Sequence, residues 1–217
     1  MSVRVLLVDD HRIMREGLRA LLASEPDIEI VGEAPDGRTA LDLVRTLVPD
    51  VVVMDVGMPE LNGVEATRQI RAETGNVKVI ALSTHADKRY VHHMLEAGAA
   101  GYVLKIGAHN ELLRAVRAAS LGKTYLSPEI AGLVVERSTH AHAASEVSAY
   151  STLGAREREV LQLVAEGKTS AETAMQMHIS MKTVETHRRN IVQKLGLHGT
   201  AELTKYAIRE GLTSLEG

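Results

Sequence analysis

Polar side chains that together could handle a phosphoryl group stand at the ends of apolar runs. The set is Asp9, Asp10, Asp55, Ser83 and Lys105. Carboxylates about 4 Å apart repel by about 4 kcal/mol per pair at an effective dielectric near 20, so either a cation sits among the three or one of them stays protonated. An all-oxygen site with few protein ligands suits Mg²⁺. With Lys105 as a mobile positive charge and Ser83 as a hydroxyl donor, the set predicts phosphoryl binding, with Asp55 as the nucleophile.

The elements before these residues are predicted to form a doubly wound parallel sheet. The runs that indicate strands are residues 3–8, 28–31, 51–54, 77–83 and 101–104, and helical spacing follows at 11–23, 36–47, 63–72, 87–97 and 108–121. Wholly apolar strands need helices on both faces, and five strand–helix units in about 120 residues are too short for an eight-stranded barrel. Strand order 2-1-3-4-5 brings all five polar side chains to one edge.

Residues 153–217 carry no strand pattern and predict a compact all-α unit. Its helices are expected at 156–166, 169–177, 180–195 and 200–210, and the second and third form a helix-turn-helix. Over residues 182–194 the local charge is +3, which fits either a solvated face or a DNA-binding one. Residues 127–152 are predicted to be a linker that contains a short helix.

Composition excludes several classes of function. The 217 residues carry a net charge of −3 and contain no Cys, Phe or Trp. The chain therefore has no disulfide or Cys-ligated zinc, and no ring platform for single-stranded nucleic acid beyond its five Tyr. No apolar run approaches the roughly 18 residues of a membrane helix, and no signal peptide is visible, so we expect a cytoplasmic protein with no membrane partner.

Residues 3–121 resemble the receiver domain of bacterial two-component response regulators. The resemblance rests on Asp9-Asp10, on Asp55 with Met58-Pro59, on Ser83 and on residues 101–105. It implies that Asp55 accepts a phosphoryl group from a sensor histidine kinase and that Lys105 binds that group. It also implies that Asp10, Asp55 and the Gly57 carbonyl hold Mg²⁺, that Asp9 assists through water, and that Ser83 and Tyr102 form a switch pair.

Residues 153–212 resemble the LuxR-type DNA-binding domain of the NarL/FixJ group, through residues 156–167, 182–191 and 194–197. The resemblance implies that helix 180–195 enters the major groove of double-stranded promoter DNA. Base edges would face Glu185, Thr186 and Arg189, and phosphates would meet Lys182, Thr183, His187, Arg188 and Lys194. Glu185 has two interpretations: it accepts from a cytosine amino group, or it pairs with Arg188 or Arg189. We expect the pairing.

Two positions depart from the LuxR-type pattern. Gly154-Ala155 stands where the family has a hydroxyl N-cap followed by Pro, and Thr173 stands at an apolar core position. Loss of an N-cap costs a few tenths of a kcal/mol when Gly replaces it. A hydroxyl in the core lowers stability, so we expect weaker DNA binding than is typical.

The sequence thus predicts three segments: a receiver domain at 1–126, a linker at 127–152 and a helix-turn-helix domain at 153–217. The expected function is a DNA-binding response regulator, not an enzyme, that forms a homodimer when phosphorylated. One alternative is a transcription factor that does not depend on phosphorylation. Another is a phosphatase with Asp55 as covalent nucleophile, which is disfavoured because Gly57 stands where a second Asp would be expected.

Overall fold

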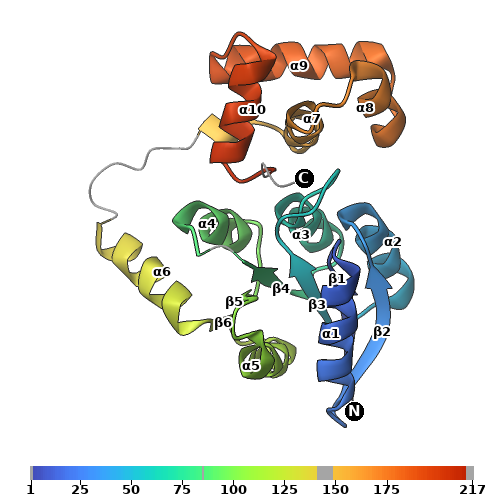
Figure 1. Ribbon diagram of the computed structural model, residues 1–217, viewed down its shortest axis with the longest axis vertical. Coiled ribbons are helices and arrows are strands. Elements are labelled where there is room, and N and C mark those ends of the chain that lie inside the picture. The colour runs from blue at the N-terminus through green and yellow to red at the C-terminus, as the bar shows by residue number, and fades with distance from the viewer. Residues whose placement is uncertain (1, 85, 141–148, 214–217) are drawn as a thin grey trace. The chain divides into compact units, whose positions relative to one another are not determined.

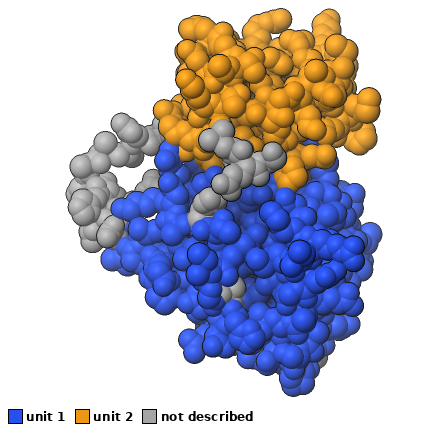
Figure 2. All heavy atoms as spheres, viewed as in Figure 1, with its two compact units in different colours: residues 1–58, 62–141 blue, residues 59–61, 142–217 orange. Residues whose placement is uncertain are grey.

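The chain divides into two compact units (Figure 2), which we describe separately. The first comprises residues 1–58 and 62–141, and the second residues 59–61 and 142–217. The computed structural model describes residues 2–84, 86–140 and 149–213. Part of the predicted linker, residues 141–148, therefore lies outside the described residues. None of the helices within the described ranges is long and apolar enough to cross a membrane.

A parallel sheet forms the centre of the first unit (Figure 1). Its strands are β1 (Val3–Val8), β2 (Ile28–Ala34), β3 (Val51–Asp55), β4 (Lys78–Ser83), β5 (Gly101–Leu104) and β6 (Tyr125–Leu126). The order β2-β1-β3-β4-β5-β6 confirms the predicted order. The predicted count of five strands is wrong, because β6 pairs with β5. Two residues are too few to show a strand period in a sequence.

Helices cover both faces of this sheet. They are α1 (Arg12–Ala23), α2 (Gly37–Leu47), α3 (Gly63–Glu73), α4 (Lys88–Glu96), α5 (Ala108–Ser120) and α6 (Pro128–His140). One hydrophobic cluster joins the sheet to α1 and α5, and another joins it to α3 and α4. Every residue of β3 is buried, as expected for a strand covered on both faces.

Helix α6 belongs to the first unit rather than to a free linker. Its Ile130 is fully buried in the cluster with α3 and α4. Ser127, just before the helix, donates its N–H to the Tyr102 carbonyl over 3.0 Å, so α6 begins directly at the sheet. The sequence shows a helix here, but its spacing does not say which surface the helix packs on.

The second unit is all-helical in its described part. It contains a short 3-10 helix η1 (Ala149–Thr152), α7 (Ala155–Ala165), α8 (Ser170–Met177), α9 (Met181–Leu195) and α10 (Thr200–Arg209). The four predicted α-helices are present, each within about one residue of the expected bounds, a normal spread. Thr169 and Ser180 cap α8 and α9 through their side chains. Between these helices His178 adopts a left-handed conformation with φ 54°, which makes the turn tight.

Candidate functional site

Register in the sheet brings the predicted acidic side chains together. Val8 of β1 pairs with Met54 of β3, so the next residues, Asp9 and Asp55, are neighbours at the carboxyl edge. From the loop after β5, Nζ of Lys105 lies 2.8 Å from Oδ2 of Asp9 and 2.8 Å from Oδ2 of Asp55. The ammonium thus bridges two buried carboxylates.

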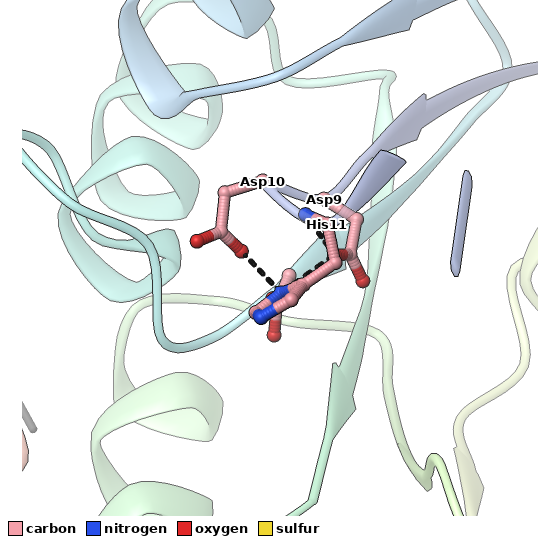
Figure 3. A group of neighbouring side chains, drawn as sticks. Asp9, Asp10 and His11 are labelled. Carbon is pink, nitrogen blue, oxygen red and sulfur yellow. Dashed lines mark hydrogen bonds and ion pairs between the residues drawn. The ribbon is translucent and has the colours of Figure 1, made fainter. Parts of the chain in front are cut away.

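Two further groups complete this acidic cluster (Figure 3). Asp10 lies close to Asp9 and Asp55, as predicted, and His11 joins them: one possible ligand atom from each of the four residues falls within 4.8 Å of all the others. The predicted metal residue Gly57 is adjacent, with its N–H 3.4 Å from Oδ1 of Asp55. His11 was not among the predicted site residues, because a histidine that follows two acidic residues is equally typical of the start of a helix.

The cluster carries an excess of negative charge. Burial, together with the charge of Asp9, raises the pKa of Asp55 to about 6, although Lys105 opposes this. Burial alone would lower the pKa of Lys105, but the two carboxylates outweigh it and raise that pKa. One ammonium faces three carboxylates, so an additional cation is needed when all of them are ionised. The oxygen donors of Asp9, Asp10 and Asp55 fit Mg²⁺.

Ser83 ends β4, and Tyr102 is the second residue of the neighbouring strand β5. Both side chains are buried. Burial raises the pKa of the Tyr102 hydroxyl, and a hydrogen bond with Ser83 acts in the opposite direction. The two predicted switch residues are therefore in direct contact, with Ser83 on the strand next to that of Asp55 and Tyr102 on the strand beyond it.

Gly63 positions Asp55 and was missed as a site residue. It is the first residue of α3, and a Cβ there would lie 2.0 Å from the Asp55 carbonyl oxygen. Its N–H donates to the Val56 carbonyl over 3.0 Å. Only glycine lets the start of α3 approach the end of β3 this closely. The Asn62-Gly63 pair was the available signal, but it reads equally well as an ordinary helix start.

Helix α9 of the second unit carries the predicted DNA-binding side chains. Val184 and Ile191 are buried in its core contacts, while the predicted contact residues are exposed or half-buried: Lys182, Thr183, Glu185, Thr186, His187, Arg188, Arg189 and Lys194. In a helix-turn-helix the exposed face of the second helix is the one available to the major groove.

Glu185 and Lys194 have partners that the sequence did not reveal. The Ser170 hydroxyl donates to Glu185 and lies 3.5 Å from an Nη1 donor of Arg188. The expected pairing of Glu185 with Arg188 or Arg189 is not among the ion pairs of the described residues, since α8 supplies a closer partner. Nζ of Lys194 lies 2.7 Å from Oε2 of Glu157 on α7. Its phosphate contact stays a prediction.

The two departures from the LuxR-type pattern have visible consequences. Gly154 caps α7 without a side chain, and Glu157 compensates in part by accepting the Gly154 N–H over 2.7 Å. Thr173 is fully buried, and its hydroxyl has no hydrogen-bond partner within the described part of the chain. The structure thus confirms a buried Thr173 hydroxyl in the core, without a hydrogen-bond partner in the described residues.

Comparison with known proteins agrees with both halves of this geometry. Residues 5–117 match the response regulator receiver domain, and residues 151–207 match the bacterial regulatory proteins of the luxR family. The transcriptional regulatory protein LiaR of Bacillus subtilis is 41% identical over 98% of this chain and 100% of its own length. Response regulator UvrY of Escherichia coli K12 is 37% identical over 99% of this chain and 97% of its own length.

A solved structure extends the similarity to a DNA complex. RcsB from Salmonella enterica serovar Typhimurium, bound to promoter rprA in the presence of the phosphomimetic BeF₃⁻, is 25% identical, covers 95% of this chain and 98% of its own, and has a TM-score of 0.62. Response regulators act with sensor kinases and bind DNA. The chain belongs to the LuxR-type two-component response regulators, DNA-binding proteins that control transcription.

Proposed function

We propose that phosphorylation of Asp55 by a sensor histidine kinase, with Mg²⁺ bound, controls DNA binding through α9. The observation that carries this is the bridge from Lys105 to Asp9 and Asp55 at 2.8 Å each, in a buried edge of the sheet. It holds a nucleophilic carboxylate beside a fixed positive charge. Phosphoryl transfer requires such positioning and charge compensation more than covalent chemistry.

Each residue of the cluster has a part in the transfer. A carboxylate oxygen of Asp55 forms the new bond to phosphorus as the phosphorus–nitrogen bond of the phosphohistidine breaks, and the released imidazole takes up a proton. Lys105 compensates the charge of the phosphoryl oxygens, and the Ser83 hydroxyl donates to one of them. Asp10, Asp55 and the Gly57 carbonyl would hold Mg²⁺, which when bound neutralises the incoming negative charge, and Asp9 would assist through water.

The Ser83–Tyr102 pair would pass this event to the surface of the first unit. Their hydroxyls are hydrogen-bonded, so a phosphoryl group that recruits Ser83 leaves Tyr102 without that partner. Tyr102 is fully buried in the cluster that also contains Ile130 of α6. A new partner for Ser83 therefore changes the packing at α4 and α6, a local charge event with a wider effect.

For the second unit we propose that α9 lies in the major groove of double-stranded promoter DNA. Glu185, Thr186 and Arg189 would face base edges, and the remaining predicted residues of α9 would bind phosphates. One helix makes few base contacts, so a homodimer on a two-fold operator gives more useful specificity. A solved structure of RcsB, in which two dimers are bound to two parallel DNAs, supports this form.

We further propose that the protein is not an enzyme that turns over small phosphoesters. Gly57 stands where an aspartyl-nucleophile phosphatase would have its second Asp, and its exposed backbone offers no general acid. Asp55 would then serve as an acceptor whose acyl phosphate forms and is later hydrolysed, rather than as the nucleophile of an enzyme that turns over small phosphoesters.

The test is binding of the full chain to a promoter library with and without Mg²⁺ and acetyl phosphate, for wild type and Asp55→Asn. We expect the donor to tighten wild-type binding and to have no effect on the variant. The enriched DNA sites then identify the operator. Asp42→Asn, an exposed acid on α2, is the control variant and should respond to the donor like wild type.

Other outcomes distinguish the alternatives. Equal binding by wild type and Asp55→Asn regardless of donor would show a transcription factor that does not depend on phosphorylation. Multiple turnovers of a small phosphoester, lost in Asp55→Asn, would show a phosphatase. Sedimentation of the same samples tests the dimer, which should form with donor in wild type and Asp42→Asn but not in Asp55→Asn.

A further inference from the structure

His11 brings an imidazole nitrogen to the acidic cluster. Its Nδ1 lies 2.9 Å from Oδ1 of Asp10 and 3.4 Å from Oδ1 of Asp9. The His11 N–H donates to that same Asp9 oxygen over 2.9 Å, which fixes the start of α1 against the carboxylate. Figure 3 shows the three side chains turned toward one another at the end of β1.

Nδ1 of His11 approaches Oδ1 of Asp10 at ion-pair distance. Oδ1 of Asp10 is buried and has no hydrogen-bond partner in the described residues, although Nδ1 stands 2.9 Å away. Cis ligands of an octahedral ion with bonds of about 2.1 Å stand about 3 Å apart. Both distances from Nδ1 are near that spacing.

We propose that His11 is a nitrogen ligand of the ion held by this cluster and makes the site favour a first-row transition ion, such as Mn²⁺ or Co²⁺, over Mg²⁺. Imidazole suits transition ions, whereas Mg²⁺ prefers oxygen donors alone. The imidazole is 71% exposed, so it can turn toward an ion without disturbing the core. This inference rests on the proposed function only in placing the ion at Asp10 and Asp55.

The experiment is titration of the full-length protein with Co²⁺ and, separately, with Mg²⁺, for wild type, His11→Gln and Asp10→Asn. Co²⁺ is followed by its visible absorption, which changes with coordination geometry and donor type, and Mg²⁺ by calorimetry. His109→Gln, which removes an exposed histidine of α5 in the same unit, controls for adventitious binding by surface histidines. Circular dichroism checks that each variant is folded.

We expect His11→Gln to weaken Co²⁺ binding about tenfold while Mg²⁺ affinity changes less than about twofold. Asp10→Asn should remove the same absorption band, and His109→Gln should keep it. The inference is overturned if wild type and His11→Gln give superimposable Co²⁺ titrations, or if His11→Gln weakens both ions equally.

Phosphorylation of the same samples by acetyl phosphate with Mg²⁺ separates the two ideas. If Asp55 is phosphorylated but His11 has no effect on Co²⁺, the proposed function stands and the inference fails. If the band depends on His11 but Asp55 is not phosphorylated, the inference stands and the proposed function fails.

Discussion

Burial of Asp55 destabilises its ionised form. The folded-state pKa of about 6 lies above the ordinary value of 3.8, so the folded protein holds this proton more tightly than the unfolded chain. The cost of ionisation is therefore absent below about pH 4 and complete above about pH 6. Without added divalent ions, Asp55→Asn should raise the free energy of unfolding at pH 7.5 by about 3 kcal/mol, measured by calorimetry of the full chain.

The pH dependence tests the cause. The advantage of Asp55→Asn should shrink when the measurement is repeated at pH 5, because wild-type Asp55 is then largely protonated. Asp42→Asn, on the exposed surface of α2, should show no such gain. If Asp55→Asn is less stable than wild type at pH 7.5, the attraction between Lys105 and ionised Asp55 outweighs the cost of burying the Asp55 carboxylate.

The buried hydroxyl of Thr173 is a second local cost. It lies in the core of the second unit with no hydrogen-bond partner in the described residues. Thr173→Val keeps the shape and removes the unsatisfied group, so unfolding by urea should require about 1 kcal/mol more. Thr173→Ser keeps the hydroxyl, loses a methyl group and should be less stable than wild type. A valine variant no more stable than wild type would contradict the prediction.

At the scale of elements, long periodic runs were predictable and short or contact-dependent features were not. The wholly apolar run before Asp55 identified a covered strand, and parallel register then placed Asp9 beside Asp55. The two-residue β6 leaves no period to detect. Contacts of His11, Glu185 and Lys194 depend on which side chain of another element comes closest, and spacing within one helix does not contain that information.

Gly63 shows how an element can control the site. A Cβ at this position would lie 2.0 Å from the Asp55 carbonyl oxygen, so α3 or β3 must shift to accept it. Gly63→Ala should lower the free energy of unfolding by about 2 kcal/mol and slow phosphorylation of Asp55 by acetyl phosphate. Gly75→Ala, with open space around the added atom, is the matched control and should do neither. Normal phosphorylation of Gly63→Ala would show that the start of α3 does not position Asp55.

The Glu157–Lys194 pair joins α7 to α9. Burial alone would raise the pKa of Glu157, but hydrogen bonds from Lys194 and the Gly154 N–H outweigh it and lower that pKa below its ordinary 4.5. A lowered folded-state pKa stabilises the protein above pH 4.5, and this contribution disappears as the pH falls through the folded value. Glu157→Gln should therefore cost about 1 kcal/mol at pH 7, with the difference fading below pH 4 in urea titrations.

Lys194→Met separates the structural role of this lysine from the predicted phosphate contact. If the ion pair with Glu157 is its main role, Lys194→Met should lose about as much stability as Glu157→Gln at pH 7. A variant with normal stability but weaker DNA binding would assign Lys194 to the phosphates instead.

At the scale of the whole molecule, the sequence located both units but not the division between them. Each unit has its own hydrophobic core, and the change from strand–helix units to helices alone was visible in the spacing. The predicted boundary after residue 126 separates α6 from a cluster that Ile130 helps to fill. An isolated amphipathic helix between two domains has an apolar side but no signal for which core receives it.

The net charge of the chain determines which part of it can attract DNA phosphates. The chain carries −3 overall, so attraction to phosphates must come from the local positive charge of α9. Exposed Lys182, at the start of this helix, should bind a phosphate and read no base. Lys182→Ala should weaken binding about equally for operator and unrelated DNA, and lower the slope of log K against log salt by about 1 for each α9 bound.

Arg189→Ala provides the contrast on the same operator. An arginine at a base edge contributes about 1–3 kcal/mol of discrimination, so this variant should lose preference for one base-pair position, while Lys182→Ala keeps every preference. Both slopes and preferences come from fluorescence anisotropy over a salt series with operators substituted at each position. If Lys182→Ala relaxes a preference and Arg189→Ala only lowers the slope, the two residues exchange roles, and α9 lies in the groove rotated from the orientation proposed here.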